Sequence, residues 1–197
     1  MDAITFRRWK NLTYHDPAAK LREYAAKFRE VEAEIAGHEI EPDALDVLAL
    51  RTNELNRYRE LRDCALFAYG IGLAFGKKIG IADDEDVDHD CITAWVDGDT
   101  ANYCPLQLKE LPPEERNPDA TIEGLLRHLP KRYAPSKTVL VVKLSRAGHV
   151  VLDRDWPDVP FAQLWFLWGS APGAARWSIY GDALAAKPGQ WAFDYPT

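Results

Sequence analysis

The chain has 197 residues, of which 47% are hydrophobic and 28% are charged, and its formal net charge is −7. These values are ordinary for one globular domain. No apolar run is long enough to span a membrane and no signal peptide is evident, so we expect a cytoplasmic protein. The acidic total argues against non-specific nucleic-acid binding, because phosphate contacts need Lys and Arg.

Three cysteines, Cys64, Cys91 and Cys104, lie inside apolar segments rather than in loops. Their odd number and their surroundings predict reduced, buried residues in a reducing compartment.

The basic residues gather in two groups, which predicts local basic surface on an acidic protein. The groups are Arg51, Arg57, Arg59 and Arg62, and then Arg127, Lys131, Arg132, Lys137, Lys143 and Arg146.

Two helical stretches open the chain. Asp16-Pro17 is typical of an N-cap followed by proline at the first helical position, and Gly37 is a suitable stop. A second helix is predicted from Glu41-Pro42-Asp43 onward, because apolar residues recur at helical spacing. Its last part, up to Phe75, is almost wholly apolar, so we expect this helix to enter the core.

A β-hairpin is predicted after an acidic segment, 83–90, that we expect to be a solvated loop. Strands 90–96 and 101–109 flank Asp97-Gly98-Asp99-Thr100, a strong turn signal. A short helix at about 120–129 and a central, buried strand within 137–145 follow.

Further strands are predicted at 149–152, 161–169 and 176–180, and the tail with Trp191 and Phe193 is expected to pack back. The whole is predicted to be one α/β (α+β) domain, a mixed sheet flanked by helices with an N-terminal helical hairpin. We divide residues 1–197 into a helical extension (1–41), a core (42–153) and an aromatic-rich C-terminal β-hairpin and tail (154–197).

The hairpin allows a test of register. If Gly98-Asp99 forms the two-residue loop, paired residue numbers sum to 197, and Asp90 lies opposite Gln107. Because side chains alternate, Asp88, Asp90, Gln107 and Lys109 would then share one face, and Leu106 and Leu108 the other. Oxygen ligands beside one lysine are what metal-assisted phosphodiester hydrolysis needs. A plain surface salt bridge is the alternative interpretation.

Asp90 followed by Pro105-Leu106-Gln107-Leu108-Lys109-Glu110 resembles the PD-(D/E)xK superfamily, whose members have the restriction-endonuclease-like fold. The resemblance covers roughly residues 53–145 and includes the order helix, hairpin, helix, strand. It implies an Mg²⁺- or Mn²⁺-dependent nuclease acting on DNA, or on RNA as the less favoured substrate.

The resemblance also implies residue roles. Asp90 would be the principal metal ligand, the Leu108 carbonyl a further ligand, and Lys109 the catalytic lysine. Gln107 would stand at the second acidic position, where its neutral amide is a departure from the commoner acid. For the helix acid that completes the metal site we favour Glu60, with Glu54 as the alternative.

Two other interpretations stay open. A nuclease-like fold without catalysis would serve as an interaction or regulatory module, which the acidic charge and Gln107 favour. A homodimer formed through the C-terminal hairpin is compatible with either function. The tryptophans of that region could stack on bases, but core or oligomer contacts are the commoner role.

Overall fold

The structure is a computed structural model, and it describes residues 3–35, 56–86, 89–146, 150–152, 155–170 and 175–197. The helices within these ranges are α1 (Ala3–Lys10), α2 (Pro17–Ile35), α4 (Asn56–Phe75), α5 (Ile122–His128) and the 3-10 turn η1 (Leu129–Lys131). The strands are β1 (Gly80–Ala82), β2 (Cys91–Asp97), β3 (Thr100–Leu111), β4 (Val139–Leu144), β5 (Gln163–Gly169), β6 (Arg176–Gly181) and β7 (Gly189–Asp194).

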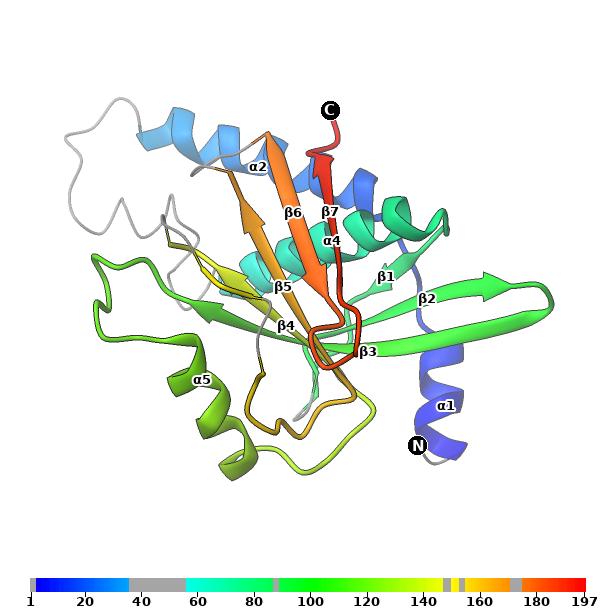
Figure 1. Cartoon of the computed structure of the whole chain (residues 1–197). Coiled ribbons are helices and arrows are strands. Elements are labelled where there is room, and N and C mark those ends of the chain that lie inside the picture. Colours follow the sequence, from blue (N-terminus) through cyan, green and yellow to red (C-terminus); the bar gives the residue numbers. More distant parts are fainter. Residues whose placement is uncertain (1–2, 36–55, 87–88, 147–149, 153–154, 171–174) are drawn as a thin grey trace.

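The described strands form one twisted, mixed sheet in which they follow chain order from β1 to β7 (Figure 1). The two central pairings, β3 with β4 and β4 with β5, are parallel, and the others are antiparallel. Parallel neighbours need a crossover, and α5 lies in the one between β3 and β4. The predicted mixed α/β class is confirmed.

Helices cover both faces of the sheet. On one face, α4 packs on a core that includes Leu106, Leu108 and Val141, and α2 lies against α4 (Figure 1). On the other face, α5 contributes to a second core with Leu140 and Phe166. The strand β4 is buried on both faces, as its apolar run predicted.

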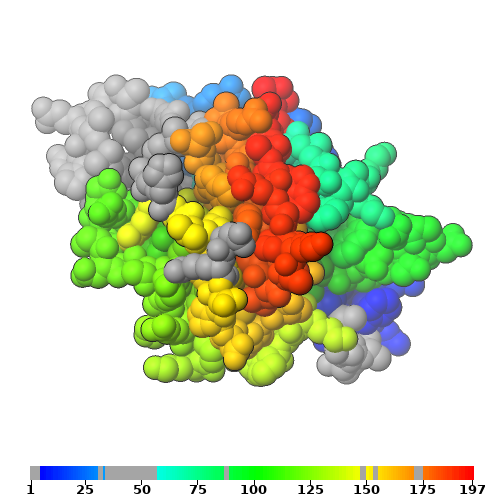
Figure 2. All heavy atoms as spheres, in the orientation of Figure 1, coloured from blue at the N-terminus to red at the C-terminus, as the bar shows by residue number. Residues whose placement is uncertain are grey.

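The predicted register of the hairpin is confirmed. Asp97 pairs with Thr100 and Cys91 with Leu106, so paired numbers sum to 197. Gly98 has a φ of 58°, a left-handed conformation that glycine adopts without steric cost. The hairpin projects from the side of the molecule (Figure 2).

The N-cap prediction is also confirmed, because the Asp16 carboxylate accepts the Ala19 N–H at 3.0 Å and α2 starts at Pro17. The helix α1 was not predicted. The predicted helix stop at Gly37 and the start of the second long helix lie outside the described residues. None of the described helices has the length and apolarity to cross a membrane.

One prediction for the last third of the chain needs correction. The strand predicted at 149–152 is not seen at 150–152, the part of it that is described; these residues are irregular. The tail packs back on the core as predicted, with Phe193 buried, and it does so as the strand β7, which pairs with β6. Gly70 on α4 gives the Phe193 ring of β7 room to approach the helix backbone.

The prediction of reduced cysteines is wrong for two of the three. Cys64 on α4 and Cys91 on β2 form a disulfide bond, with their Cα atoms 6.8 Å apart. Both side chains point into the same core, and only the packing of α4 across the sheet brings them together. Cys104 is free, as predicted. The inference of a reducing compartment loses its support.

Candidate active site

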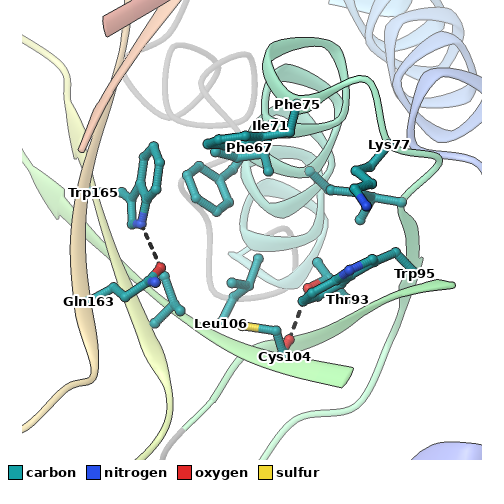
Figure 3. Close-up of a pocket in the computed structure, with 13 residues that line it drawn as sticks. Phe67, Ile71, Phe75, Lys77, Thr93, Trp95, Cys104, Leu106, Gln163 and Trp165 are labelled. Atoms are coloured by element: carbon teal, nitrogen blue, oxygen red, sulfur yellow. Dashed lines mark hydrogen bonds between the residues drawn. The ribbon is translucent and has the colours of Figure 1, made fainter. Parts of the chain in front are cut away.

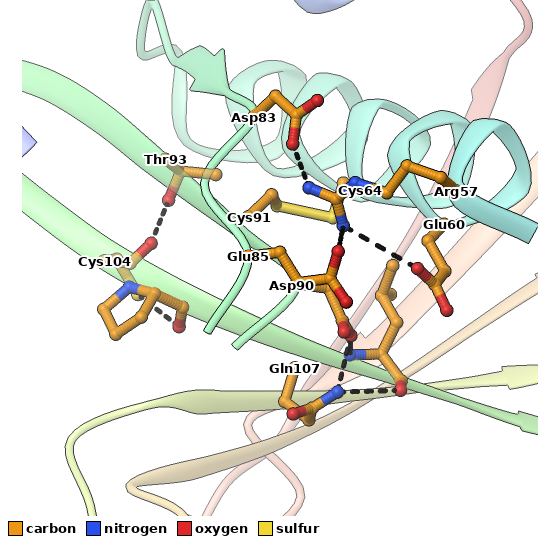
Figure 4. Close-up of a disulfide and its surroundings, with 12 residues drawn as sticks. Arg57, Glu60, Cys64, Asp83, Glu85, Asp90, Cys91, Thr93, Cys104 and Gln107 are labelled. Atoms are coloured by element: carbon orange, nitrogen blue, oxygen red, sulfur yellow. Dashed lines mark hydrogen bonds and ion pairs between the residues drawn. A yellow bond between two sulfur atoms is a disulfide. The ribbon is translucent and has the colours of Figure 1, made fainter. Parts of the chain in front are cut away.

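Asp90 lies directly before β2 and meets the facing strand through both its main chain and its side chain. Its N–H donates to the Leu106 carbonyl at 2.7 Å. Its carboxylate oxygen Oδ2 accepts the Leu108 N–H at 2.6 Å and the Gln107 side-chain amide at 2.6 Å (Figure 4). The predicted proximity of Asp90 and Gln107 is therefore confirmed, and the carboxylate is fixed at the end of the hairpin.

Gln107 is 3% exposed, and its side-chain amide nitrogen donates hydrogen bonds to two oxygen atoms. Its Nε2 donates to Asp90 Oδ2 at 2.6 Å and to the Leu108 carbonyl at 3.3 Å. A carbonyl oxygen accepts only, and Oδ2 already accepts the Leu108 N–H, so the NH₂ group must face these two oxygens. One amide nitrogen thus bridges two of the predicted metal ligands.

Glu60 lies near Asp90, on the neighbouring helix α4. Burial and the charge of Asp90 raise the pKa of Glu60, against the charge of Arg57. The Arg57 guanidinium is 3.7 Å from the Glu60 carboxylate, and the side chain of Glu60 is 32% exposed (Figure 4). An acid whose ionisation is opposed by a neighbouring acid is typical of a functional site.

Asp90 has the same type of perturbation. Burial raises its pKa, whereas the hydrogen bond from the Leu108 N–H and the charges of Lys109 and Arg57 act to lower it. The charge of Lys109 is thus close enough to influence Asp90. The charge of Asp90 thus influences Glu60 on α4, and the charge of Lys109 on β3 influences Asp90.

Lys109 also faces the side of the sheet covered by α5. Its Nζ lies 5.4 Å from the centre of the Tyr133 ring, a cation–π contact. It lines an open pocket of about 500 Å³ together with Thr121, His128 and Arg132. The lysine therefore belongs to a partly basic surface, and its charge also influences Asp90.

The disulfide bond joins the two elements that carry the acids. Cys64 is one helical turn after Glu60 on α4, and Cys91 directly follows Asp90 (Figure 4). The bond fixes how far the helix acid can move from the strand acid. This covalent link was not foreseen from the sequence.

The acidic segment before β2 is an exposed loop at Asp83, Glu85 and Asp86, as predicted, but it is not solvated throughout. Asp84 is 8% exposed and pairs with Arg8 of α1, and His89 Nε2 lies 3.4 Å from the same carboxylate. Asp83 and Glu85 pair with Arg57. These ion pairs link the segment to α1 and α4, so the acids help to stabilise the packing of both helices.

Arg57 is the residue of this site that sequence reasoning missed. It pairs with Glu60, with Asp83 and with Glu85 at 3.6 Å. The spacing of three residues between Arg57 and Glu60 on one helix was a visible signal, since such residues are neighbours. No local sequence signal indicated Glu85 as a partner of Arg57, because the two residues meet only when α4 packs beside the segment before β2.

Part of the predicted basic surface is neutralised within the fold. Lys143 is 9% exposed, and its Nζ binds both carboxylate oxygens of Asp63, at 2.8 and 3.1 Å. Its prediction as a surface residue was wrong, because β4 is buried on both faces. Arg59 pairs with Glu110. In the second basic group, Arg127, Lys131, Arg132 and Lys137 are exposed.

The donor set fits a hard cation in part. The Asp90 carboxylate and the Leu108 carbonyl face one point, where the Gln107 nitrogen lies, and both are oxygen ligands of the kind Mg²⁺ takes. Among the described residues, however, no three His, Cys, Asp or Glu side chains gather closely enough to hold a metal ion. Asp88 and Glu54, two further predicted acids, lie outside the described residues.

A second pocket, of about 310 Å³, lies between α4 and the sheet and is mainly apolar (Figure 3). Its walls include Phe67, Trp95 and Trp165, and the free thiol of Cys104 borders it. Burial raises the pKa of this thiol to about 11, so it is an unreactive side chain at neutral pH. The described residues that line this pocket include no acid.

Comparison of the chain with protein-family models, with curated proteins and with solved structures found no match. The assignment of function therefore rests on the geometry of the chain itself.

Proposed function

We propose that this chain is a metal-dependent nuclease of the PD-(D/E)xK type that hydrolyses phosphodiester bonds, with DNA as the favoured substrate. The observation that carries the proposal is the Asp90 carboxylate, which Gln107 and the Leu108 N–H hold at the end of the hairpin, where the charge of Lys109 reaches it and its own charge reaches Glu60. The order of those elements also agrees with the resemblance, since α4 precedes the hairpin and α5 and β4 follow it.

Each residue has a role that its contacts permit. Asp90, the Leu108 carbonyl and Glu60 would hold Mg²⁺ or Mn²⁺, which when bound supplies Lewis-acid stabilisation of charge on the phosphate. Lys109 carries a positive charge near Asp90 and would orient the attacking water or stabilise the developing charge. The Leu108 N–H keeps the Asp90 carboxylate in place.

The surface beyond Lys109 favours a polyanionic substrate. The pocket beside α5 is lined by Lys109, His128 and Arg132, with Asp119 as its one acid among the described residues. Exposed Arg127 and Lys131 lie on the same segment of the chain. A nucleic-acid backbone could follow this basic surface with its phosphates, although the net charge of the protein is negative.

Cleavage of supercoiled plasmid DNA with Mg²⁺ or Mn²⁺ tests the proposal. We expect Asp90→Ala and Lys109→Ala each to lower the rate by about 100-fold or more, the usual loss when a charge-stabilising group is removed. Single-stranded RNA in a parallel assay distinguishes the two substrates.

Matched controls separate catalysis from folding. Asp99→Ala removes an exposed acid in the hairpin turn, and Lys187→Ala removes an exposed lysine far along the chain. Both should cleave like the wild type, and circular dichroism should show that all variants fold. Equal cleavage by the wild type, Asp90→Ala and Lys109→Ala would refute the proposal.

A second candidate function is a nuclease-like interaction module without catalysis. The observation that favours it is charge pairing inside the site, because Arg57 engages Glu60 and Glu85 and Lys109 contacts Tyr133. Calorimetric titration with Mn²⁺ distinguishes the two functions. A nuclease should bind Mn²⁺ in a way that Asp90→Ala abolishes, whereas an inert module should show no such binding.

A further inference from the structure

The bridging amide of Gln107 has a consequence for metal binding that goes beyond its position in the motif. Its Nε2 is 2.6 Å from Asp90 Oδ2 and 3.3 Å from the Leu108 carbonyl. A cation shared by these two oxygens would need to lie between them, where the nitrogen now is. The NH₂ group carries partial positive charge, so it satisfies the two acceptors as a weak substitute for a cation.

We propose that the Gln107 side chain closes the cation site of the metal-free protein, and that metal binds only after this amide has turned its nitrogen away. The inference rests on the proposed function, since it concerns the same site. It assigns Gln107 the role of a positioning residue that limits metal affinity, in contrast to the acid that the resemblance would place there.

The surroundings explain why the closed arrangement is stable. Gln107 and Leu108 are both buried, so the Leu108 carbonyl has little access to water and needs a donor. The hydrogen bond to a carboxylate is charge-assisted, and such bonds are about twice as strong as neutral ones. Rotation of the amide by half a turn would present its oxygen to a cation instead.

The inference predicts that Gln107→Ala strengthens metal binding and lowers the stability of the metal-free protein. Gln107→Ala removes the competing nitrogen, so Mn²⁺ should bind about tenfold more tightly, the value of one charge-assisted hydrogen bond that no longer has to break. The metal-free variant should nevertheless unfold at a lower temperature, because two oxygens lose their donor. Gln107→Glu should bind Mn²⁺ more tightly still, because it adds a charged ligand.

The experiment is a titration with Mn²⁺, followed by calorimetry and by the electron paramagnetic resonance of the free ion. It compares the wild type, Gln107→Ala, Gln107→Glu and, as a control, Gln163→Ala, which removes a half-buried glutamine of β5 from the same sheet. The control should bind Mn²⁺ like the wild type. Weaker binding by Gln107→Ala would overturn the inference, because Gln107 would then be a ligand.

A measurement on the wild type alone avoids any folding problem of the variants. In nitrogen-15 NMR spectra, the side-chain NH₂ signals of Gln107 should shift strongly on saturation with Mg²⁺, as the bond to Asp90 breaks. Binding of Mg²⁺ without such a shift would overturn the inference and leave the nuclease proposal intact. Absence of Mn²⁺ binding in every variant, Gln107→Glu included, would overturn both.

Discussion

Two acidic side chains on α4, less than one helical turn apart, have opposite environments. Asp63 is paired with two cations. Lys143 binds both of its carboxylate oxygens, and Arg62 lies 3.0 Å from one of them. Glu60 faces a second acid, Asp90, and shares Arg57 with two other carboxylates.

The pKa values follow this difference. Burial alone would raise the pKa of Asp63, but the charges of Lys143 and Arg62 outweigh it and hold that pKa below its usual value. The pKa values of Glu60 and Asp90 are instead raised. The positive charge that Asp63 needs comes from side chains of the protein. Glu60 and Asp90 lack enough positive charge around them, and a bound cation would supply it. One helix thus carries an acid that is paired inside the fold and an acid for which we propose a functional role.

The largest expected effect comes from breaking the structural pair. Asp63→Ala leaves the Lys143 ammonium buried without its partner, and such a loss costs about 3–5 kcal/mol of unfolding free energy. Urea denaturation followed by tryptophan fluorescence measures it. The double variant Asp63→Leu/Lys143→Met should recover most of the loss, because it leaves no buried charge. A loss below about 1 kcal/mol in the single variant would contradict a desolvated pair.

The pH dependence of stability has a definite sign at this pair. Because folding lowers the pKa of Asp63, its contribution is fully present above the unfolded-state pKa and is lost as the pH falls through the folded-state value. Stability of the wild type should therefore fall on acidification more steeply than that of Asp63→Leu/Lys143→Met. Parallel curves for the two proteins would contradict this sign.

The next effect concerns the bond that links the two elements of the functional pair. Cys64 and Cys91 are separated by 27 residues, and a disulfide closing a loop of that size contributes roughly 3–4 kcal/mol through the entropy of the unfolded chain. Cys64→Ala/Cys91→Ala should lose about this amount in the same denaturation assay. Cys104→Ala, which removes the free thiol, is the matched control and should change stability far less.

The register of the hairpin could be predicted because it depends on local chemistry. The turn at Gly98 fixes which residues of β2 and β3 are opposite, and from this the meeting of Asp90 with Gln107 follows. The N-cap at Asp16 is local in the same sense.

The contacts that were missed depend on how distant elements pack. Asp63 and Lys143 are 80 residues apart in sequence, and Lys143 was counted as a surface lysine although its strand was predicted to be buried, because no local signal indicated Asp63 as its partner. The disulfide between Cys64 and Cys91 likewise requires α4 to cross the sheet at one particular place. The partner of Asp90 on the facing strand could be predicted, whereas the partners that Asp63 and Glu85 find on distant elements could not.

Replacement of Asp90 by asparagine should have a smaller effect of the opposite sign. Burial and the charge of Glu85 make an ionised Asp90 unfavourable, whereas an asparagine carbonyl can still accept the Leu108 N–H. We expect Asp90→Asn to stabilise the metal-free protein at pH 8 by about 0.5–2 kcal/mol, as is common when a functional residue is replaced.

Thermal unfolding with and without Mn²⁺ checks this expectation and its cause. Mn²⁺ should raise the unfolding temperature of the wild type and leave that of Asp90→Asn unchanged, because a ligand stabilises only the state that binds it. A destabilised Asp90→Asn variant would instead identify Asp90 as a structural residue like Asp63.

The smallest effect is expected at the basic surface beyond Lys109. Arg132 is exposed and lines the pocket into which Lys109 faces, so its proposed role is a single phosphate contact. Arg132→Gln should lower the slope of log affinity for duplex DNA against log salt concentration by about one, equally for different sequences. Fluorescence anisotropy with catalytically silent Lys109→Ala protein measures the slope. Arg176→Gln, which removes an exposed arginine on β6, is the control. An equal change of slope in both variants would contradict a nucleic-acid-binding surface at α5.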